Sequence, residues 1–268
     1  NWSDTFFAQE GLNTVQVRQT RANSTPGGAF TDTNPTASAV FSFTLDTQAA
    51  VPVVTLAPVA TDGVLNAVER AGNVRLTGLV SGEARAGDVV TVEVHGETFS
   101  TTVGADLAFS VVVPGSSLAG ANPAEGVVRT VSVQVASRDV AGNLGLGTTS
   151  LDFSVDSVLP VLRQAAVSGT TLVLSYDEGA GALATDTSLA AAFTVDNGGV
   201  AVAVQDAQVD AQAKTVTLTL GAAVTGGAAL TVSYQAPGAQ GLRDSAGNLA
   251  ASVNQFAVVN ATELPAQT

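Results

Sequence analysis

Valine or leucine alternates with a polar residue in four separate runs of the sequence, at 89–94, 130–135, 215–220 and 229–234. The polar positions hold threonine, serine, glutamine or glutamate. A period of two places every apolar side chain of a run on one face, which predicts half-buried antiparallel strands. Helical periodicity is sparse, and its best candidate is one or two turns at 187–192, capped by Ser188. The chain is therefore expected to be all-β.

A motif that closes a turn occurs twice at a long interval. Asp-x-Ala-Gly-Asn-Leu stands at 139–144 and again at 244–249, and a strand and a Leu-Pro pair follow each copy. A weaker copy of the strand at 41–46 leads to Pro52 in the same way. The repeating unit is thus about 100 residues long, the size of an immunoglobulin-like sandwich.

These repeats divide the chain into tandem immunoglobulin-like antiparallel β-sandwiches preceded by a partial one. We expect sandwiches at 51–156 and 157–262 and a tail at 263–268. Residues 1–50 are expected to hold only the C-terminal part of an earlier unit, with strands near 2–7, 14–20 and 39–45. Three strands cannot close a sandwich. Either the chain is cut within a domain, or another chain supplies the missing strands.

Composition excludes several classes of function. The formal charge is −13, with 10 Lys and Arg against 23 Asp and Glu, which argues against nucleic acid as a partner. The sequence has no cysteine and one histidine, so disulfides, thiolate nucleophiles and multi-histidine metal sites are excluded. No apolar run reaches the length of a membrane span. Methionine is also absent, and we expect a piece of a larger secreted product.

The repeats resemble two known kinds of bacterial surface module. Residues 51–160 resemble the immunoglobulin-like repeats of large adhesins and biofilm-associated proteins, through Asp-Gly-Val-Leu-Asn-Ala-Val-Glu at 62–69, the strands at 90–94 and 109–114, and the Asp-x-Ala-Gly-Asn turn. Residues 157–262 resemble a repeat of long cyanobacterial-type surface proteins, one of which is required for swimming motility. The segments that match are 169–178, 193–195, 230–234 and 242–248. The resemblance implies an extracellular, non-enzymatic tandem array.

No set of residues in the sequence predicts catalysis. His95 precedes Gly96 between two alternating runs and is expected at a hairpin tip, where no carboxylate or nucleophile would hold it. Asp177 and Glu178 are adjacent carboxylates at a strand end, and strand neighbours point to opposite faces. We therefore expect no enzyme and no catalytic residue.

Calcium at the domain junctions is the one cofactor that the sequence suggests. Calcium prefers oxygen ligands from Asp, Glu, Asn and carbonyl groups. We expect one cluster to combine Asp46 with Asp62, Asn66 and Glu69, and a second to combine Asp139, Asn143 and Asp156. The alternative is that Asp-x-Ala-Gly-Asn serves only as a turn, in which Asp accepts backbone hydrogen bonds.

The expected function is mechanical. The chain is interpreted as a stalk or spacer of a secreted or cell-surface bacterial protein in adhesion or biofilm. Its expected partners are neighbouring repeats, copies of itself, or a surface receptor or glycan, without nucleic acid and without membrane insertion. One alternative is a subunit of an extracellular filament or layer joined by strand donation. The other is a module that binds carbohydrate or ice through exposed aromatic or threonine-rich faces.

Overall fold

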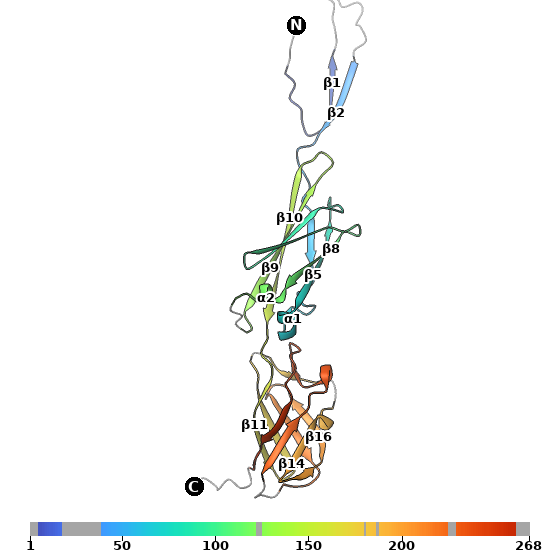
Figure 1. Ribbon diagram of the computed structural model, residues 1–268. Coiled ribbons are helices and arrows are strands. Elements are labelled where there is room, and N and C mark those ends of the chain that lie inside the picture. The colour runs from blue at the N-terminus through green and yellow to red at the C-terminus, as the bar shows by residue number, and fades with distance from the viewer. Residues whose placement is uncertain are drawn as a thin grey trace, which may run out of the picture.

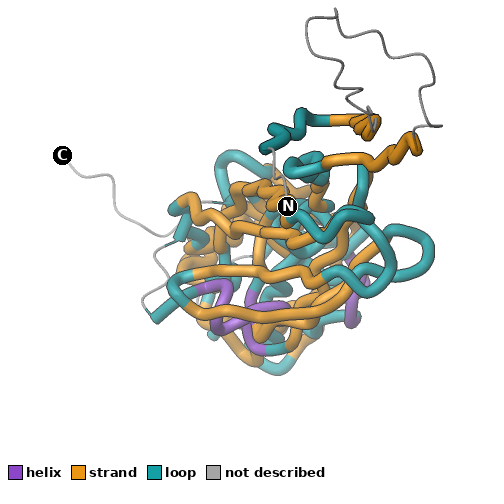
Figure 2. The backbone as a smooth tube through the Cα atoms, turned by 90° about the horizontal axis from the view of Figure 1, so that it is seen from above, coloured by secondary structure: helices purple, strands orange, loops and turns teal. Residues whose placement is uncertain are grey.

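The computed structural model describes residues 5–17, 39–121, 125–179, 181–185, 188–224 and 229–260. A two-stranded ribbon, a first β-sandwich and a second β-sandwich follow one another along one long axis (Figure 1). Seen from above, the two sandwiches project onto one another, as units stacked end to end do (Figure 2). The predicted all-β fold class is confirmed.

The ribbon consists of β1 (Gly11–Val17) and β2 (Ala39–Leu45), paired antiparallel. Val15 lies opposite Phe41 and Asn13 opposite Phe43, so both phenylalanines share one face. That face is only partly covered: Phe6 packs edge-on against Phe43, and Phe41 and Phe43 remain 62% and 42% exposed. The strand expected near 2–7 is wrong for its described part, because residues 5–10 are not strand.

The first sandwich has two sheets. The smaller has the order β3-β5-β8 and the larger β4-β10-β9-β6-β7. Their bounds are β3 Val53–Leu56, β4 Val64–Leu65, β5 Asn73–Ser81, β6 Val89–Val94, β7 Glu97–Thr102, β8 Ala108–Pro114, β9 Val128–Arg138 and β10 Leu144–Val155. Two short helices, α1 (Ala67–Ala71) and α2 (Gly115–Ala119), complete it.

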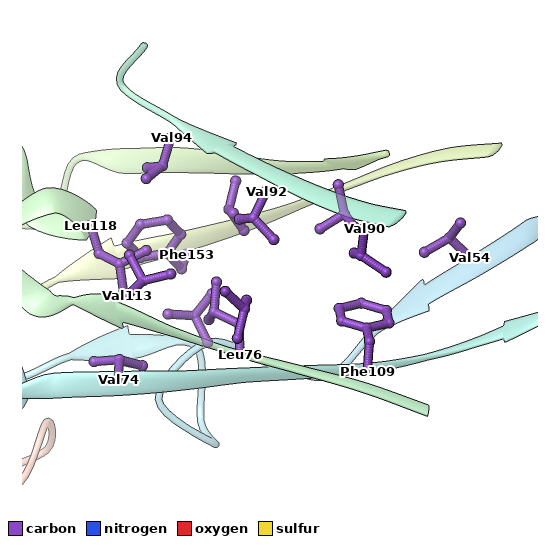
Figure 3. Close-up of a cluster of buried hydrophobic side chains, with 14 of the residues drawn as sticks. Val54, Val74, Leu76, Val90, Val92, Val94, Phe109, Val113, Leu118 and Phe153 are labelled. Carbon is purple, nitrogen blue, oxygen red and sulfur yellow. The ribbon is translucent and has the colours of Figure 1, made fainter. Parts of the chain in front are cut away.

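The core of the first sandwich is formed by the apolar residues that alternate with polar ones along its strands. Val90, Val92 and Val94 on β6 are buried, and they face Leu76 and Phe109 from the opposite sheet (Figure 3). The β6–β7 hairpin turns at His95 and Gly96, both in the left-handed region (φ 50° and 80°) that a tight hairpin turn requires.

The second sandwich repeats this plan with sheets ordered β16-β17-β12-β11-β21 and β15-β14-β18-β20, and with a small β13-β19 pair. The bounds are β11 Val161–Ser168, β12 Thr171–Asp177, β13 Leu183–Ala184, β14 Phe193–Asn197, β15 Val200–Val202, β16 Val204–Asp210, β17 Thr215–Leu220, β18 Leu230–Tyr234, β19 Arg243–Asp244, β20 Val253–Ala257 and β21 Val259–Asn260. Two 3-10 turns, η1 (Ala190–Ala192) and η2 (Gly238–Gln240), lie between strands.

The helix expected at 187–192 is only the 3-10 turn η1. Its N-cap is Leu189, without a side-chain hydrogen bond, so Ser188 does not cap it, and Thr187 lies outside the described residues. In the core beneath it, the rings of Phe193 and Tyr234 lie 4.9 Å apart. The Tyr234 hydroxyl also accepts a hydrogen bond from the backbone N–H of Leu242, at 2.8 Å.

The buried apolar residues form two separate clusters, one within residues 54–155 and the other within 162–250. The boundary predicted at 156–157 lies between them. The helices in the described part of the chain are all too short for a membrane crossing.

Candidate metal centre

The Asp-x-Ala-Gly-Asn turn of the second sandwich is closed by its first and last residues. Asp244 Oδ1 accepts hydrogen bonds from the backbone N–H groups of Ala246 (2.9 Å) and Asn248 (2.8 Å). The Asp244 N–H in turn donates to the Asn248 carbonyl at 3.1 Å. Gly247 sits at φ 89°, which favours glycine. The motif therefore builds a rigid loop and holds the Asp244 carboxylate within it.

The Asn248 side chain joins this loop to the first sandwich. Its Nδ2 donates to the carbonyl of Asp156 at 2.8 Å and to Asp244 Oδ2 at 2.7 Å. Its Oδ1 accepts from the backbone N–H of Ala67, the first residue of α1, at 2.6 Å. We call these contacts the second junction.

Three carboxylates converge at the second junction. Asp156 follows the end of β10, Glu178 follows the end of β12, and Asp244 ends β19. One oxygen from each lies within 4.8 Å of the others. All three side chains are buried, at 7%, 4% and 1% exposure. Isolated buried carboxylates are costly, so such a group calls for a cation or for protons.

Several oxygens of this group lack a hydrogen-bond partner within the described part of the chain. They are Asp156 Oδ1 and both carboxylate oxygens of Glu178. Burial, with the charges of Asp244 and Asp156, raises the pKa of Glu178 to about 7. Burial, with the charges of Asp244 and Glu125, also raises the pKa of Asp156. A bound cation or added protons would neutralise these two groups.

A small space lies among these oxygens. Gly181 borders it: a Cβ there would lie 3.1 Å from Glu178 Oε1 and from Ser245 Oγ, and 3.2 Å from Asp156 Oδ2. The adjoining cavity measures about 200 Å³ and is lined by Asp156, Gly181 and Ser245 among others. Calcium takes six to eight oxygen ligands. Three carboxylates with a nearby hydroxyl fit that requirement.

Lys214 fixes the turn that carries Glu178. Its ammonium group donates to the backbone carbonyls of Glu178 (2.6 Å) and Gly179 (3.0 Å), while the Glu178 side chain points to the carboxylate group. The lysine charge opposes the rise in the Glu178 pKa, but burial outweighs it. Lys214 is a positioning residue for this site.

The Asp-x-Ala-Gly-Asn turn of the first sandwich, at 139–143, forms an equivalent set of contacts, which we call the first junction. Asn143 Nδ2 donates to the carbonyl of Asp46 and to Asp139 Oδ2, each at 2.9 Å. Asp139 Oδ1 accepts from the Asn143 N–H, also at 2.9 Å. Burial alone would raise the pKa of Asp139, but the hydrogen bonds from Asn143 and the turn backbone lower it.

The structure groups the seven predicted ligands differently from the sequence prediction. Asp46 lies with Asp139 and Asn143 rather than with Asp62, Asn66 and Glu69, and Asp156 lies at the second junction. The reason is that the segment 62–69 lies at the end of the first sandwich that faces the second, where β4 pairs with the C-terminal residues of β10.

Asp62, Asn66 and Glu69 are used locally in this structure. Asp62 accepts from the N–H of Val64 at 2.9 Å. Asn66 and Glu69 form a reciprocal capping box at the start of α1, with bonds of 3.0 Å in each direction. Burial, with the Asp62 charge, raises the pKa of Glu69 against the effect of that hydrogen bond. Whether any of the seven binds calcium stays a prediction.

Sequence reasoning did not assign Glu178 or Asp244 to a metal site. The signal for Asp244 was the second copy of the turn motif. Glu178 could have been noticed because it is adjacent to Asp177. The two side chains point apart, since Asp177 is exposed and pairs with Arg163 at 3.1 Å while Glu178 is buried.

Comparisons with known proteins agree with this architecture. A solved bacterial immunoglobulin-like domain from the ice-binding adhesin of M. primoryensis is 38% identical, over 40% of this chain and 100% of that domain, with a TM-score of 0.37. The chain belongs to the bacterial immunoglobulin-like repeats. Within it, residues 155–239 match the family model of the SWM repeat, described as a "Putative flagellar system-associated repeat".

Two longer solved structures are also similar to these immunoglobulin-like repeats. One is from a 1.5-MDa bacterial ice-binding adhesin, at 18% identity, with a TM-score of 0.51, covering 94% of this chain and 75% of that one. The other is a Ca2+-stabilized adhesin of an Antarctic bacterium, at 23% identity and a TM-score of 0.48, covering 93% of this chain and 57% of that one. No curated protein sequence matches the chain.

Proposed function

We propose that this chain is a non-enzymatic stalk or spacer segment of a secreted, cell-surface bacterial adhesin, and that calcium stiffens it at the second junction. The end-to-end order of ribbon and sandwiches supports a role in reach (Figure 1). The identity with a domain of an ice-binding adhesin supports membership of a surface protein. Neighbouring repeats are the partners expected on this basis, with a cell-surface receptor or glycan beyond them.

The observation that carries the proposal is the buried group of Asp156, Glu178 and Asp244. It lies between the two apolar clusters, with ligands contributed from both sides of the boundary. A cation bound there links the end of β10 to the turns of the second sandwich. Bending at the junction would pull these ligands apart, so the binding energy of calcium opposes bending. Calcium sites of extracellular modules commonly bind in the range 10⁻⁴–10⁻³ M.

The test is thermal unfolding with chelator and with millimolar calcium. Calcium at about ten times its Kd stabilises the folded state by about 1.4 kcal/mol. The wild type should therefore gain roughly 5 °C in Tm. Glu178→Gln should lose most of the gain, whereas Asp177→Asn, its exposed neighbour, should keep it. A wild type without any gain would refute the calcium proposal.

One observation favours a second candidate function, assembly into a filament by strand donation. The apolar face of the N-terminal ribbon leaves Phe41 62% and Phe43 42% exposed, although Phe6 packs against Phe43, and both strands have a free edge within the described residues. Such a face and edge favour pairing with strands from another molecule. Light scattering across a concentration series tests it. The double variant Phe41→Ser, Phe43→Ser should lower the mass of any polymer, whereas Leu12→Ser, on the opposite face, should not.

A further inference from the structure

We infer that calcium controls only the second of the two junctions, and that the first junction closes without it. This inference rests on the proposed calcium site. It makes the chain a rod with one permanently fixed joint and one joint whose stiffness depends on the calcium around it.

The two junctions share one hydrogen-bonded clamp. In each, the asparagine of the turn donates to the backbone carbonyl of the aspartate that ends the preceding unit: Asn143 to Asp46 at 2.9 Å and Asn248 to Asp156 at 2.8 Å. These bonds involve neutral donors and acceptors. The clamp alone therefore gives no reason for a difference, and the difference comes from the carboxylates around it.

At the first junction, the carboxylates are satisfied or exposed. Asp139 receives hydrogen bonds on both oxygens, and those bonds hold its pKa below the ordinary value. Asp46 is half-buried, and its Oδ1 accepts from the N–H of Gln48 at 3.3 Å and from Asn143 Nδ2 at 3.4 Å. The acidic residue that follows β5, as Glu178 follows β12, is Glu83, and its side chain is exposed. Within the described ranges, no group of three metal-ligating side chains forms here.

At the second junction, closure brings three carboxylates together. Asp156 and Glu178 present unpartnered oxygens to Asp244, and like charges in a buried site repel. Glu125 adds a fourth negative charge nearby, and its carboxylate accepts from the N–H and hydroxyl of Ser157. Lys214 is the basic group that faces Glu178, and it is used on backbone carbonyls. These charges oppose closure of the joint unless a cation binds or the carboxylates take up protons.

Packing of the linker also favours a permanently closed first junction. Residues 50–52 lie directly against β10. A Cβ at Gly145 would lie 2.5 Å from the Ala50 carbonyl oxygen, and one at Gly147 would lie 2.1 Å from that of Pro52. Only glycine permits so close an approach of two backbones. This contact needs no ion.

The experiment measures each joint separately by electron-spin distance measurements on the full chain. Since the chain has no cysteine, labels go only where they are introduced. The pair Thr44→Cys and Thr98→Cys spans the first junction, and the pair Thr98→Cys and Thr219→Cys spans the second. All three threonines are exposed. Each pair is measured with chelator and with millimolar calcium.

The expected result is that calcium narrows the distance distribution of the 98/219 pair by about twofold and leaves that of the 44/98 pair unchanged. If both pairs narrow, the inference is overturned while calcium binding at the second junction stands. If neither changes, the proposed calcium function fails, and the inference falls with it. The two failures are thus distinguishable.

A clamp variant provides a second readout. Asn143→Ala should broaden the 44/98 distribution equally with and without calcium, since the bond to Asp46 is lost in both conditions. Asn248→Ala is the matched control and should leave the 44/98 pair unaffected. If Asn143→Ala broadens the 44/98 pair only in chelator, calcium also supports the first junction and the inference is wrong.

Discussion

The buried carboxylate of Glu178 has an unfavourable electrostatic energy that a bound cation would lower. Glu178 is 4% exposed, and within the described part of the chain neither of its carboxylate oxygens has a hydrogen-bond partner. With Asp156 and Asp244 beside it, protonation or a bound cation relieves the same repulsion. Under the proposed function, calcium and protons therefore compete for this residue.

Glu178→Gln should remove a pH dependence from the calcium-free protein. The pKa of Glu178 rises from an ordinary value of 4.5 to about 7 in the folded state, so the folded state binds more protons between these values. Stability then falls as the pH rises from about 5 to 7, by about 2 kcal/mol over this range. Measurements of Tm in chelator across this pH range check the prediction. The Tm of the wild type should fall as the pH rises, whereas the Tm of the variant should stay nearly constant.

The matched control for that titration is Asp177→Asn, which changes an exposed carboxylate and should keep the wild-type slope. A Glu178→Gln protein that retained the slope would place the titrating group elsewhere. Asp156 would be the next candidate, since its pKa is also raised.

Gly181→Ala should weaken calcium binding by about tenfold or more, because its methyl group would enter the space that the oxygens of Glu178, Asp156 and Ser245 border. Fluorescent-chelator competition measures the change in Kd. Gly179→Ala is the control, because a Cβ there meets only Val158 at 3.8–3.9 Å. Equal affinities in the two variants would show that calcium does not occupy this space.

At the scale of elements, the alternation of apolar and polar residues predicted the strands well, because a strand with one buried face needs an apolar residue at every second position. Val90, Val92 and Val94 are buried as their spacing indicates, and the His95–Gly96 turn follows them. The helix α1 was missed although its capping box, Asn66 to Glu69, is visible in the sequence. Five residues are too few for a helical period to show.

For the proposed metal site, the sequence predicted the residue types but not which residues come together. Asp46 and Asp62 are close together in the sequence, yet they lie at opposite ends of the first sandwich. Asp46 contacts Asn143, just before β10 begins, whereas Asp62 precedes β4, which pairs with the last residues of β10. Glu178 lies beyond the end of β12, where strand alternation no longer fixes the direction of a side chain. Its convergence with Asp244 depends on tertiary packing.

The close backbone contact between β10 and the linker at Pro52 should be sensitive to added side-chain volume. Gly147→Ala would place a Cβ 2.1 Å from the Pro52 carbonyl, so strand or linker must shift. We expect a destabilisation of roughly 1–3 kcal/mol, measured by urea unfolding. Leu146→Ala, at a 45% exposed neighbour on the same strand, should cost much less. Equal effects would show that the backbone contact has no energetic role.

At the scale of the whole molecule, separate apolar clusters predict separate unfolding events. Leu76 and Leu218 are 1% and 0% exposed and belong to different clusters. A buried Leu→Ala change typically costs 2–5 kcal/mol, or roughly 10 °C or more in Tm for a unit of this size.

Calorimetry in chelator should therefore show two transitions. Leu76→Ala should lower one and Leu218→Ala the other, each leaving its companion in place. A single transition that both variants shift equally would mean that one cooperative core spans the chain.

The claim on which the whole account depends is that the three carboxylates at the second junction bind calcium, and calorimetric titration of the full chain with calcium measures this most directly. The account predicts one site on the wild type, with protons released near pH 7 as Glu178 ionises, and no measurable site in a Glu178→Gln, Asp244→Asn double variant. A wild type that gives no binding heat in any buffer up to millimolar calcium, or a double variant that binds as the wild type does, would contradict it.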